Sequence, residues 1–383
     1  MSSERPPDQH DSFLELLRNV SVLRVVLLHL VLRPPLVYLP WIQWIYPGMP
    51  EIFFVSGALA AASISRRGPV QVTIRRLRRV LLPYGVYAVV ALISMTVTDG
   101  RSPDPAARLS WRGVLSFVFP LTEPTGSKTR AILWSHLWFV TVFLWLVLLT
   151  PLLLRATRHV GVFVVALPLL AVAGAVFGRQ VMHWNVPSEI GLVGQFGTYY
   201  AMGLLWAQRK LGGTPLSTNR TTQLTNKRHS RRWLVAALVC GAGGVVVGTI
   251  IEPIRNKRPP ELYSSRSAYL LVGLAWLALA LAFHEPLSNW TRRHRYRWLQ
   301  ACTQRTFTLY LWGLPADSIG VAVAKRLLPN RWLAVPVYVL VSLVALSAAV
   351  IAVGWVEDVS AGRRPRLLPF LAGEQTRLPA PSH

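Results

Sequence analysis

The sequence is poor in charged residues, and poorest in acidic ones. Only 15% of its 383 residues are charged, whereas soluble domains average ~25%. Asp and Glu number 16 against 41 Lys and Arg, so the formal net charge is +25. Cysteine is also scarce: Cys240 and Cys302 lie far apart and form no CxxC pair, which argues against a disulfide framework and against a zinc or other metal site. These scarcities exclude both an ordinary soluble domain and a cysteine-stapled one.

Hydrophobic residues make up 52% of the chain, and they are gathered in blocks separated by short polar connectors. A helix needs ~20 apolar residues to cross a bilayer, where it satisfies its own backbone hydrogen bonds. The pattern predicts an all-α polytopic membrane protein with about ten transmembrane helices and no separate soluble domain. The predicted spans are residues 12–33, 49–65, 79–98, 133–154, 159–178, 190–208, 233–252, 267–285, 300–324 and 332–355.

We expect residues 1–355 to form one membrane domain and residues 356–383 to be a disordered cytoplasmic tail. Arg33-Pro34-Pro35 follow the first block without a small-residue cleavage site, so this block is expected to remain as the first helix. Residues 99–132 contain the stretch SWRGVLSFVFPL, which predicts a short interfacial or re-entrant piece. Residues 209–232 are basic and rich in Gly, Ser, Thr and Asn, which predicts a flexible linker.

The positive charge has two explanations, nucleic acid and the bilayer. The arginines lie in connectors between apolar blocks and form no basic face of a soluble domain, so we predict a lipid bilayer as partner and no nucleic acid. With a cytoplasmic N-terminus, the inside segments carry 25 Lys and Arg and the outside segments carry 14. Because cytoplasmic connectors hold the excess of Lys and Arg, the sequence predicts a multi-pass protein of the cell membrane with both termini in the cytoplasm.

The first block carries ionisable residues that a plain membrane anchor does not need. Arg18 and His29 are eleven residues apart, so in a helix they share one face within about 20° and lie roughly 16 Å apart along the axis. Ionisable side chains inside a membrane are costly and usually functional. The alternatives are a snorkelling arginine and a histidine bonded between helices. Arg24 lies off this face and is expected to pair with another helix, and Glu15 to form a local ion pair with Arg18.

Four stretches, taken in order, resemble the motifs of one family. They are Arg18 and His29 with ten residues between them, Phe53-Phe54-Val55-Ser56-Gly57, Arg75-Arg76-Leu77-Arg78-Arg79 followed by Pro83-Tyr84, and Trp134-Ser135-His136-Leu137-Trp138-Phe139-Val140. With these motifs the chain resembles the acyltransferase 3 family of integral membrane O-acyltransferases, and the resemblance covers the whole membrane region. Gly313 departs from the pattern, because family members commonly have histidine after the Tyr-Leu-Trp of the ninth helix.

The resemblance implies transfer of an acyl group, such as acetyl, from cytoplasmic acyl-CoA to a hydroxyl of a glycan, a lipid-linked sugar or a secondary metabolite. Acyl-CoA would be the donor substrate, and no cofactor would be bound permanently. His29 would be the catalytic base, since neutral imidazole accepts a proton near pH 7, with Arg18 as its catalytic partner. The arginines that would bind the phosphates of coenzyme A are Arg75, Arg76, Arg78 and Arg79. The residues that would line the acceptor side are His136, Trp138 and Ser56.

Each assignment has a structural alternative. The arginine run satisfies the positive-inside rule without a ligand, Ser56-Gly57 permits close helix packing, and Trp138 suits an interfacial anchor. For the whole chain, a transporter or flippase of an anionic or acylated small molecule would use the same buried charges without covalent chemistry. No inverted repeat and no matching pair of broken helices is apparent in the sequence, which argues against transport. An inactive relative that serves as a scaffold is the third alternative.

Overall fold

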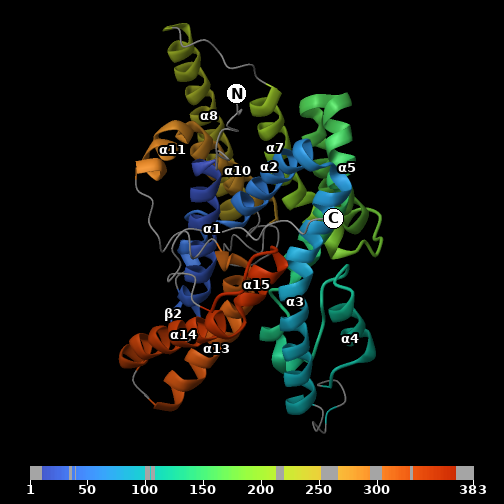
Figure 1. The fold of residues 1–383 in the computed structure, drawn as a ribbon, viewed down its shortest axis with the longest axis vertical. Coiled ribbons are helices and arrows are strands. Elements are labelled where there is room, and N and C mark those ends of the chain that lie inside the picture. The colour runs from blue at the N-terminus through green and yellow to red at the C-terminus, as the bar shows by residue number, and fades with distance from the viewer. Residues whose placement is uncertain are drawn as a thin grey trace, which may run out of the picture.

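The computed structural model describes residues 11–33, 37–38, 40–99, 104, 108–212, 220–251, 266–293, 304–327 and 331–367. In these ranges the regular structure is helical, apart from a two-residue antiparallel pair of β1 (Leu32–Arg33) with β2 (Val37–Tyr38). Figure 1 shows long helices lying side by side over the length of the molecule. The predicted class, an all-α polytopic membrane protein, is therefore confirmed.

A long helix stands at each of the ten predicted spans. These helices are α1 (Ser12–Val31), α2 (Met49–Arg67), α3 (Pro69–Asp99), α5 (Trp138–Val160), α6 (Ala166–Gln180), α7 (Ser188–Gly212), α8 (Arg220–Val246), α10 (Arg266–Ala282), α13 (Thr306–Leu327) and α14 (Arg331–Val353). Shorter elements join them: η1 (Pro40–Trp44), α4 (Trp111–Val118), η3 (Lys128–Leu133), η4 (Gly161–Val165), η5 (Val247–Ile251), α11 (His284–Arg293) and α15 (Trp355–Ser360).

The number of membrane crossings is not confirmed as ten. By length and apolar composition, the described residues hold six candidate spans, or seven if α10 and α11 count as one span bent by 66°. One candidate, Arg130–Arg179, contains both α5 and α6. The helix α1 is not among the candidates, and its polar residues are the ones that made the first block unusual as a sequence.

Three differences from the predicted boundaries matter for the arrangement of the polar residues. The helix α3 begins at Pro69 instead of residue 79, so the arginine run lies within a helix. Within the predicted linker, residues 209–212 belong to α7 and residues 220–232 belong to α8, so the flexible-linker prediction is wrong there, while residues 213–219 lie outside the described ranges. Lys, Arg and Gln are good helix formers, and an adjoining apolar helix propagates into them. Within the predicted tail, α15 and the segment up to Leu367 are placed against the bundle, while residues 368–383 lie outside the described ranges.

The short helix α4 occupies the stretch that predicted an interfacial piece. It begins after Ser110, whose hydroxyl accepts a hydrogen bond from the backbone N–H of Gly113, and this is the usual N-cap arrangement. Its two faces differ, since Phe117 is buried whereas Trp111 and Val118 are exposed. An amphipathic helix of this kind agrees with the interfacial prediction.

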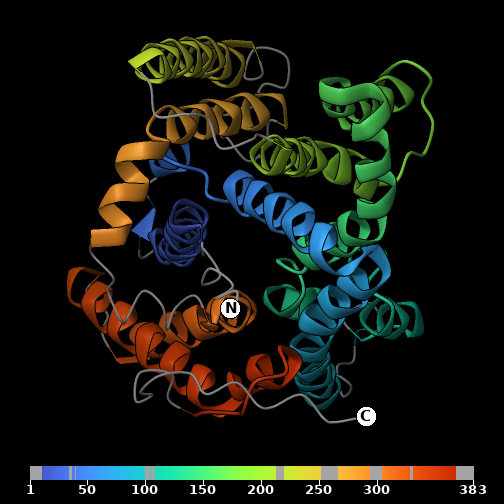
Figure 2. The same ribbon diagram turned by 45° about the horizontal axis from the view of Figure 1, so that its top comes forward.

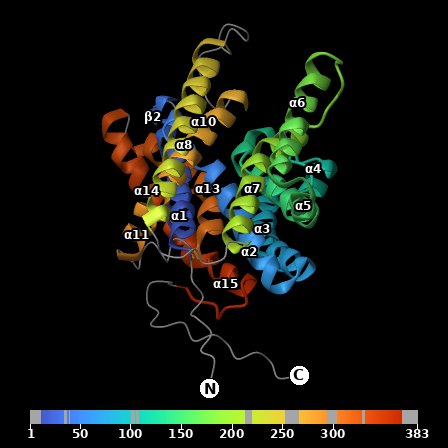
Figure 3. The same cartoon turned by 90° about the horizontal axis from the view of Figure 1, so that it is seen from above.

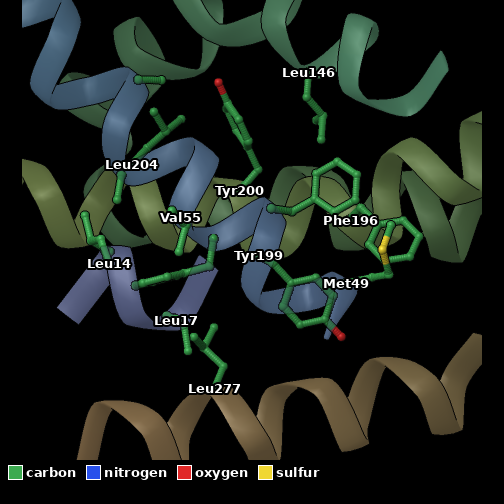
Figure 4. Packing of buried hydrophobic residues seen from close by; sticks show 14 of the residues in the cluster. Leu14, Leu17, Met49, Val55, Leu146, Phe196, Tyr199, Tyr200, Leu204 and Leu277 are labelled. Atoms are coloured by element: carbon green, nitrogen blue, oxygen red, sulfur yellow. The ribbon is translucent and has the colours of Figure 1, made fainter. Parts of the chain in front are cut away.

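The helix α7 holds three neighbours together. A Cβ on Gly57 would lie 2.1 Å from the backbone oxygen of Tyr200, and one on Gly203 would lie 2.0 Å from that of Phe54, so α2 and α7 cross at backbone contact. This confirms the close-packing interpretation of the Ser56-Gly57 pair. Tyr199 and Tyr200 point to opposite sides of α7, as Figure 4 shows. Tyr200 bonds Thr150 of α5 at 2.6 Å, and Tyr199 donates to the backbone oxygen of Leu270 in α10 at 2.8 Å.

The helix α1 lies inside the bundle. Figure 2 shows it surrounded by the other helices, and it contacts α2, α11 and α13. Figure 3 shows α5, α6 and α7 grouped on one side and α13 and α14 on the other. The polar residues of α1 therefore face protein on several sides, which is where ionisable groups of a membrane protein can be tolerated.

Candidate functional site

One unbroken helix positions the two residues that the sequence singled out. Arg18 and His29 both lie in α1, and both are half-buried. Since no kink or break interrupts the helix between them, the predicted geometry stands: one face, with roughly 16 Å between the two positions along the axis. The stripe therefore joins a guanidinium near one end of the bundle to an imidazole three turns further along.

Arg18 meets other cations at its end of the bundle. Arg79 of α3 and Arg363, which follows α15, both lie within electrostatic range of Arg18. The carboxylates in that range are Glu15, one turn away in α1, and Glu357 of α15. The Nε of Arg18 is buried and has no hydrogen-bond partner in the described part of the chain. Arginines from three separate segments thus lie within electrostatic range of one another, and one of them has a buried N–H group without a hydrogen-bond partner among the described residues.

The four arginines of α3 do not act as one group. The buried face of α3 contains Val72, Val80 and Tyr84, and Arg76 lies at the centre of that face by helical geometry. Its guanidinium donates to the backbone oxygen of Ser56 at 3.0 Å and bonds the hydroxyl of Tyr200. Arg76 thereby ties α3 to α2 and α7.

The other three arginines of the run are exposed. Arg79 borders the buried face and interacts electrostatically with Arg18, whereas Arg75 and Arg78 lie further round the helix. The structure therefore brings one arginine of the predicted donor set, Arg79, to Arg18. Arg76 is already committed to partners inside the protein.

A buried ionic clamp holds the C-terminal segment in place. The side chain of Arg305 is 2% exposed and bonds the carboxylate of Asp358 at 2.6 Å, with further bonds to the backbone oxygens of Gly354 and Arg366. Asp358 also pairs with Arg363 at 3.1 Å. The clamp fixes α15 and the following residues against the start of α13. The sequence did not predict it, because its partners are about fifty residues apart along the chain.

The same contact region holds a titratable group near neutrality. Burial raises the pKa of Glu357 to about 7, although a hydrogen bond from the backbone N–H of Thr308 and the charge of Arg305 oppose the rise. A carboxyl with a raised folded-state pKa stabilises the fold below its unfolded value, here 4.5, and that contribution is lost as the pH rises through about 7.

Glu357→Gln should therefore gain stability relative to wild type as the pH rises from 5 to 8. Glutamine keeps an oxygen that accepts the hydrogen bond from Thr308, and it has no charge that burial would desolvate. The gain in free energy of unfolding relative to wild type can therefore reach about 3 kcal/mol, at ~1.4 kcal/mol per pKa unit. Melting temperatures of both proteins across this range measure it, and Glu285→Gln, on exposed surface, is the matched control. A constant difference between Glu357→Gln and wild type at every pH would contradict the prediction.

The other end of the stripe is bounded by α13 and α14. The hydroxyl of Tyr338 donates to the backbone oxygen of Leu30, next to His29, at 2.9 Å and also bonds the buried carboxylate of Asp317. Gly313 lies one turn before Asp317 on α13, and a Cβ there would have no heavy atom within 4 Å. The position where relatives commonly carry histidine is thus open space in this chain.

Glu51 is a buried acid that the sequence interpretation passed over. It stands in the first turn of α2 and is 0% exposed. The backbone N–H groups of Gly48 and Glu51 lie near its carboxylate, yet neither carboxylate oxygen has a hydrogen-bond partner in the ranges that the structure describes. Tyr46 and Tyr199 lie within electrostatic range. An ionisable group kept at such cost inside a membrane protein marks a candidate functional residue.

Replacing Glu51 tests whether this buried carboxyl is needed for activity. Glu51→Gln should leave the melting temperature unchanged or higher, because it replaces a buried ionisable carboxyl that lacks good hydrogen bonds with a neutral group of similar size. Turnover should fall about tenfold or more if the carboxylate serves the reaction, since functional sites retain destabilising groups. Thermal melts and turnover on the same preparation decide between the roles. A large drop in melting temperature with normal turnover per folded molecule would make Glu51 a structural residue.

The predicted acceptor-side residues lie in different surroundings. His136 is buried between α3 and α13, where its Nε2 lies 3.1 Å from the backbone oxygen of Leu311 and its ring packs against Tyr87. Trp138 is half-buried and stacks on Phe196 with ring centroids 5.1 Å apart, so it packs against the aromatic core. The backbone oxygen of Ser56 is bonded by Arg76, as described above, which puts Ser56 with the arginines.

Arg24 binds backbone oxygens that follow α1 in the chain. It donates from Nε to the backbone oxygen of Ile45 at 3.0 Å and from Nη2 to that of Ile42 at 2.5 Å. The predicted partner was another helix, and the bonded oxygens belong to the short 3₁₀ helix η1 and the residue after it. No group of three or more His, Cys, Asp or Glu side chains is placed to hold a metal ion within the described ranges.

A signal for the missed acids was present in the sequence. The chain has only 16 Asp and Glu residues, and among them Glu51 and Asp317 lie inside predicted spans and Asp358 lies shortly after one. Acids in such positions are rare and are usually paired or functional. The structure shows one clamped by arginines, one bonded by a tyrosine and one without a partner of good geometry in its described parts.

Comparison with known proteins identifies the family of this chain. The family model for acyltransferase 3, described as an acyltransferase domain, matches residues 11–354, which is nearly the whole chain. A search of curated proteins and a search of solved structures each found no match. The matched region contains the α1 stripe, the α2–α7 crossing and the arginine run of α3. The chain therefore belongs to the acyltransferase 3 family and is a multi-pass membrane acyltransferase.

Proposed function

We propose that the protein transfers an acyl group from cytoplasmic acyl-CoA to a hydroxyl of a glycan, a lipid-linked sugar or a secondary metabolite. The observation that carries this proposal is the α1 stripe, with Arg18 among other arginines at one end and His29 three turns away. Its length of roughly 16 Å is similar in scale to the extended pantetheine arm that joins the phosphates of coenzyme A to its thioester. Both termini are proposed to lie in the cytoplasm, with the arginine end of α1 on that side.

In this proposal each residue has one task. The arginines hold the phosphates by charge-assisted hydrogen bonds, which fixes the thioester beyond them. His29 accepts the proton of the acceptor hydroxyl as its oxygen attacks the thioester carbonyl carbon. The new C–O bond forms, the C–S bond breaks, and the proton passes from the imidazolium to the leaving thiolate. The products are an ester and free coenzyme A.

Thioester consumption tests the proposal against transport. Purified full-length protein would be given acyl-CoA of several chain lengths and a panel of hydroxyl-bearing acceptors, and free coenzyme A would be followed with a thiol reagent. Acceptor-dependent release of coenzyme A supports acyl transfer. Uptake of labelled anion or acylated compound into proteoliposomes, without any loss of thioester, would instead establish a transporter.

A further inference from the structure

Three arginines from separate parts of the chain lie close enough to interact electrostatically. Arg18 belongs to α1, Arg79 to α3 and Arg363 to the segment after α15, and each lies within electrostatic range of the other two. The helix α15 packs against α3, the helix that carries Arg79, as Figures 1 and 2 show. The sequence motifs pointed to Arg18 and Arg79 but gave no reason to include a residue beyond position 354.

Arg363 is held in place but not neutralised. Its Nη2 lies 3.1 Å from Oδ1 of Asp358, and its backbone N–H donates to the backbone oxygen of the same residue at 2.8 Å. Asp358 is already paired with the buried Arg305 at 2.6 Å. One carboxylate therefore serves two guanidinium groups, which leaves a surplus positive charge beside Arg18.

Some hydrogen-bond donors of the cluster are also unsatisfied. The Nε atoms of Arg18 and Arg363 are both buried and both lack a hydrogen-bond partner in the described part of the chain. Unpaired buried N–H groups on charged side chains cost free energy, and like charges gathered in one place add to that cost. A phosphate, with several acceptor oxygens and negative charge, relieves both costs at once.

We infer that Arg363 completes a phosphate-binding site with Arg18 and Arg79, and that the site takes a phosphate of the acyl-CoA donor. This inference rests on the proposed function. The clamp of Arg305 and Asp358 gives the C-terminal segment its part in the site, because it fixes the residues that present Arg363. Topology alone accounts for a basic tail, but a topology signal does not require a half-buried arginine locked to a buried acid.

The test compares Arg363→Gln with Arg364→Gln. The two substitutions remove the same charge from adjacent positions, but Arg364 is exposed and stands outside the cluster. For acyl-CoA, Arg363→Gln should raise KM about tenfold or more, whereas for acyl-pantetheine, which carries no phosphate, KM should stay as in wild type. Arg364→Gln should match wild type with both donors. Equal KM values for acyl-CoA in the two variants would overturn the inference, while turnover by wild type would still support the proposed function.

A binding measurement distinguishes a phosphate of the acyl-CoA donor from the phosphate of a lipid headgroup, and it does not depend on turnover. Adenosine 3′,5′-bisphosphate should raise the melting temperature of wild type and of Arg364→Gln, and should do so less for Arg363→Gln, with Arg363→Lys in between. If Arg363→Gln instead lost binding to phosphatidylglycerol vesicles and kept its response to the nucleotide, the site would hold a lipid headgroup, which overturns the donor assignment. If wild type consumed no thioester but still bound the nucleotide through Arg363, the proposed function would fail and the phosphate site would stand.

Discussion

His29→Gln should lower the rate of acyl transfer by ~10²–10⁴, the usual loss when a general base is removed. Glutamine has similar size and can hydrogen-bond, but it cannot accept a proton near neutral pH. The position is half-buried at the end of a well-packed helix, so the fold should tolerate the change. Free coenzyme A released per molecule of folded protein measures the rate. Donor binding, followed by the melting-temperature rise with coenzyme A, should be unchanged.

Two other histidines provide the controls for that measurement. His159 is exposed at the last turn of α5, and His159→Gln should have wild-type turnover. His136→Gln should have a smaller effect than His29→Gln, because the ring nitrogen Nε2 already faces the backbone oxygen of Leu311 inside the core. Near wild-type turnover in His29→Gln would remove His29 as the base. The next candidates would then be His136 and Glu51.

Much of the helical framework followed from the sequence because it depends on local composition. Apolar blocks long enough to span a membrane were enough to locate ten helices, and eleven-residue spacing was enough to align Arg18 with His29. The sequence also predicted the close packing at Gly57, since helices that cross at backbone contact need small residues at the crossing point. These features depend on a single helix, or on residue size at one position.

The rest depended on contacts between distant segments. Whether Arg76 or Arg79 faces the core is decided by which side of α3 packs on α2 and α7, and the run of four arginines contains no information about that side. The pairing of Arg305 with Asp358 joins two segments whose polar residues look like ordinary connectors. A disordered tail was predicted from residue 356 onward, whereas a buried ionic clamp holds its first part against the bundle in the structure.

Inside the arginine run, two substitutions should have opposite consequences. Arg79→Gln should raise the KM for acyl-CoA more than tenfold and leave the melting temperature unchanged, because Arg79 is exposed at the edge of the cluster around Arg18. Arg76→Gln should lower the melting temperature and the yield of folded protein, because it removes a charged donor from the backbone oxygen of Ser56 and from the hydroxyl of Tyr200 inside the core. The KM of the Arg76→Gln molecules that do fold should change less than that of Arg79→Gln.

Arg75→Gln is the matched control, since it removes the same charge from an exposed position of the same helix. Thermal melts and donor titrations on the three variants and wild type give both quantities for each arginine. Equal rises in KM for Arg75→Gln and Arg79→Gln would mean that the run attracts the donor only through its total charge. Normal stability with a high KM in Arg76→Gln would mean that its guanidinium leaves Ser56 and Tyr200 to bind phosphate. The expected division instead makes Arg76 the residue that anchors α3 and Arg79 the residue of that helix that meets the donor.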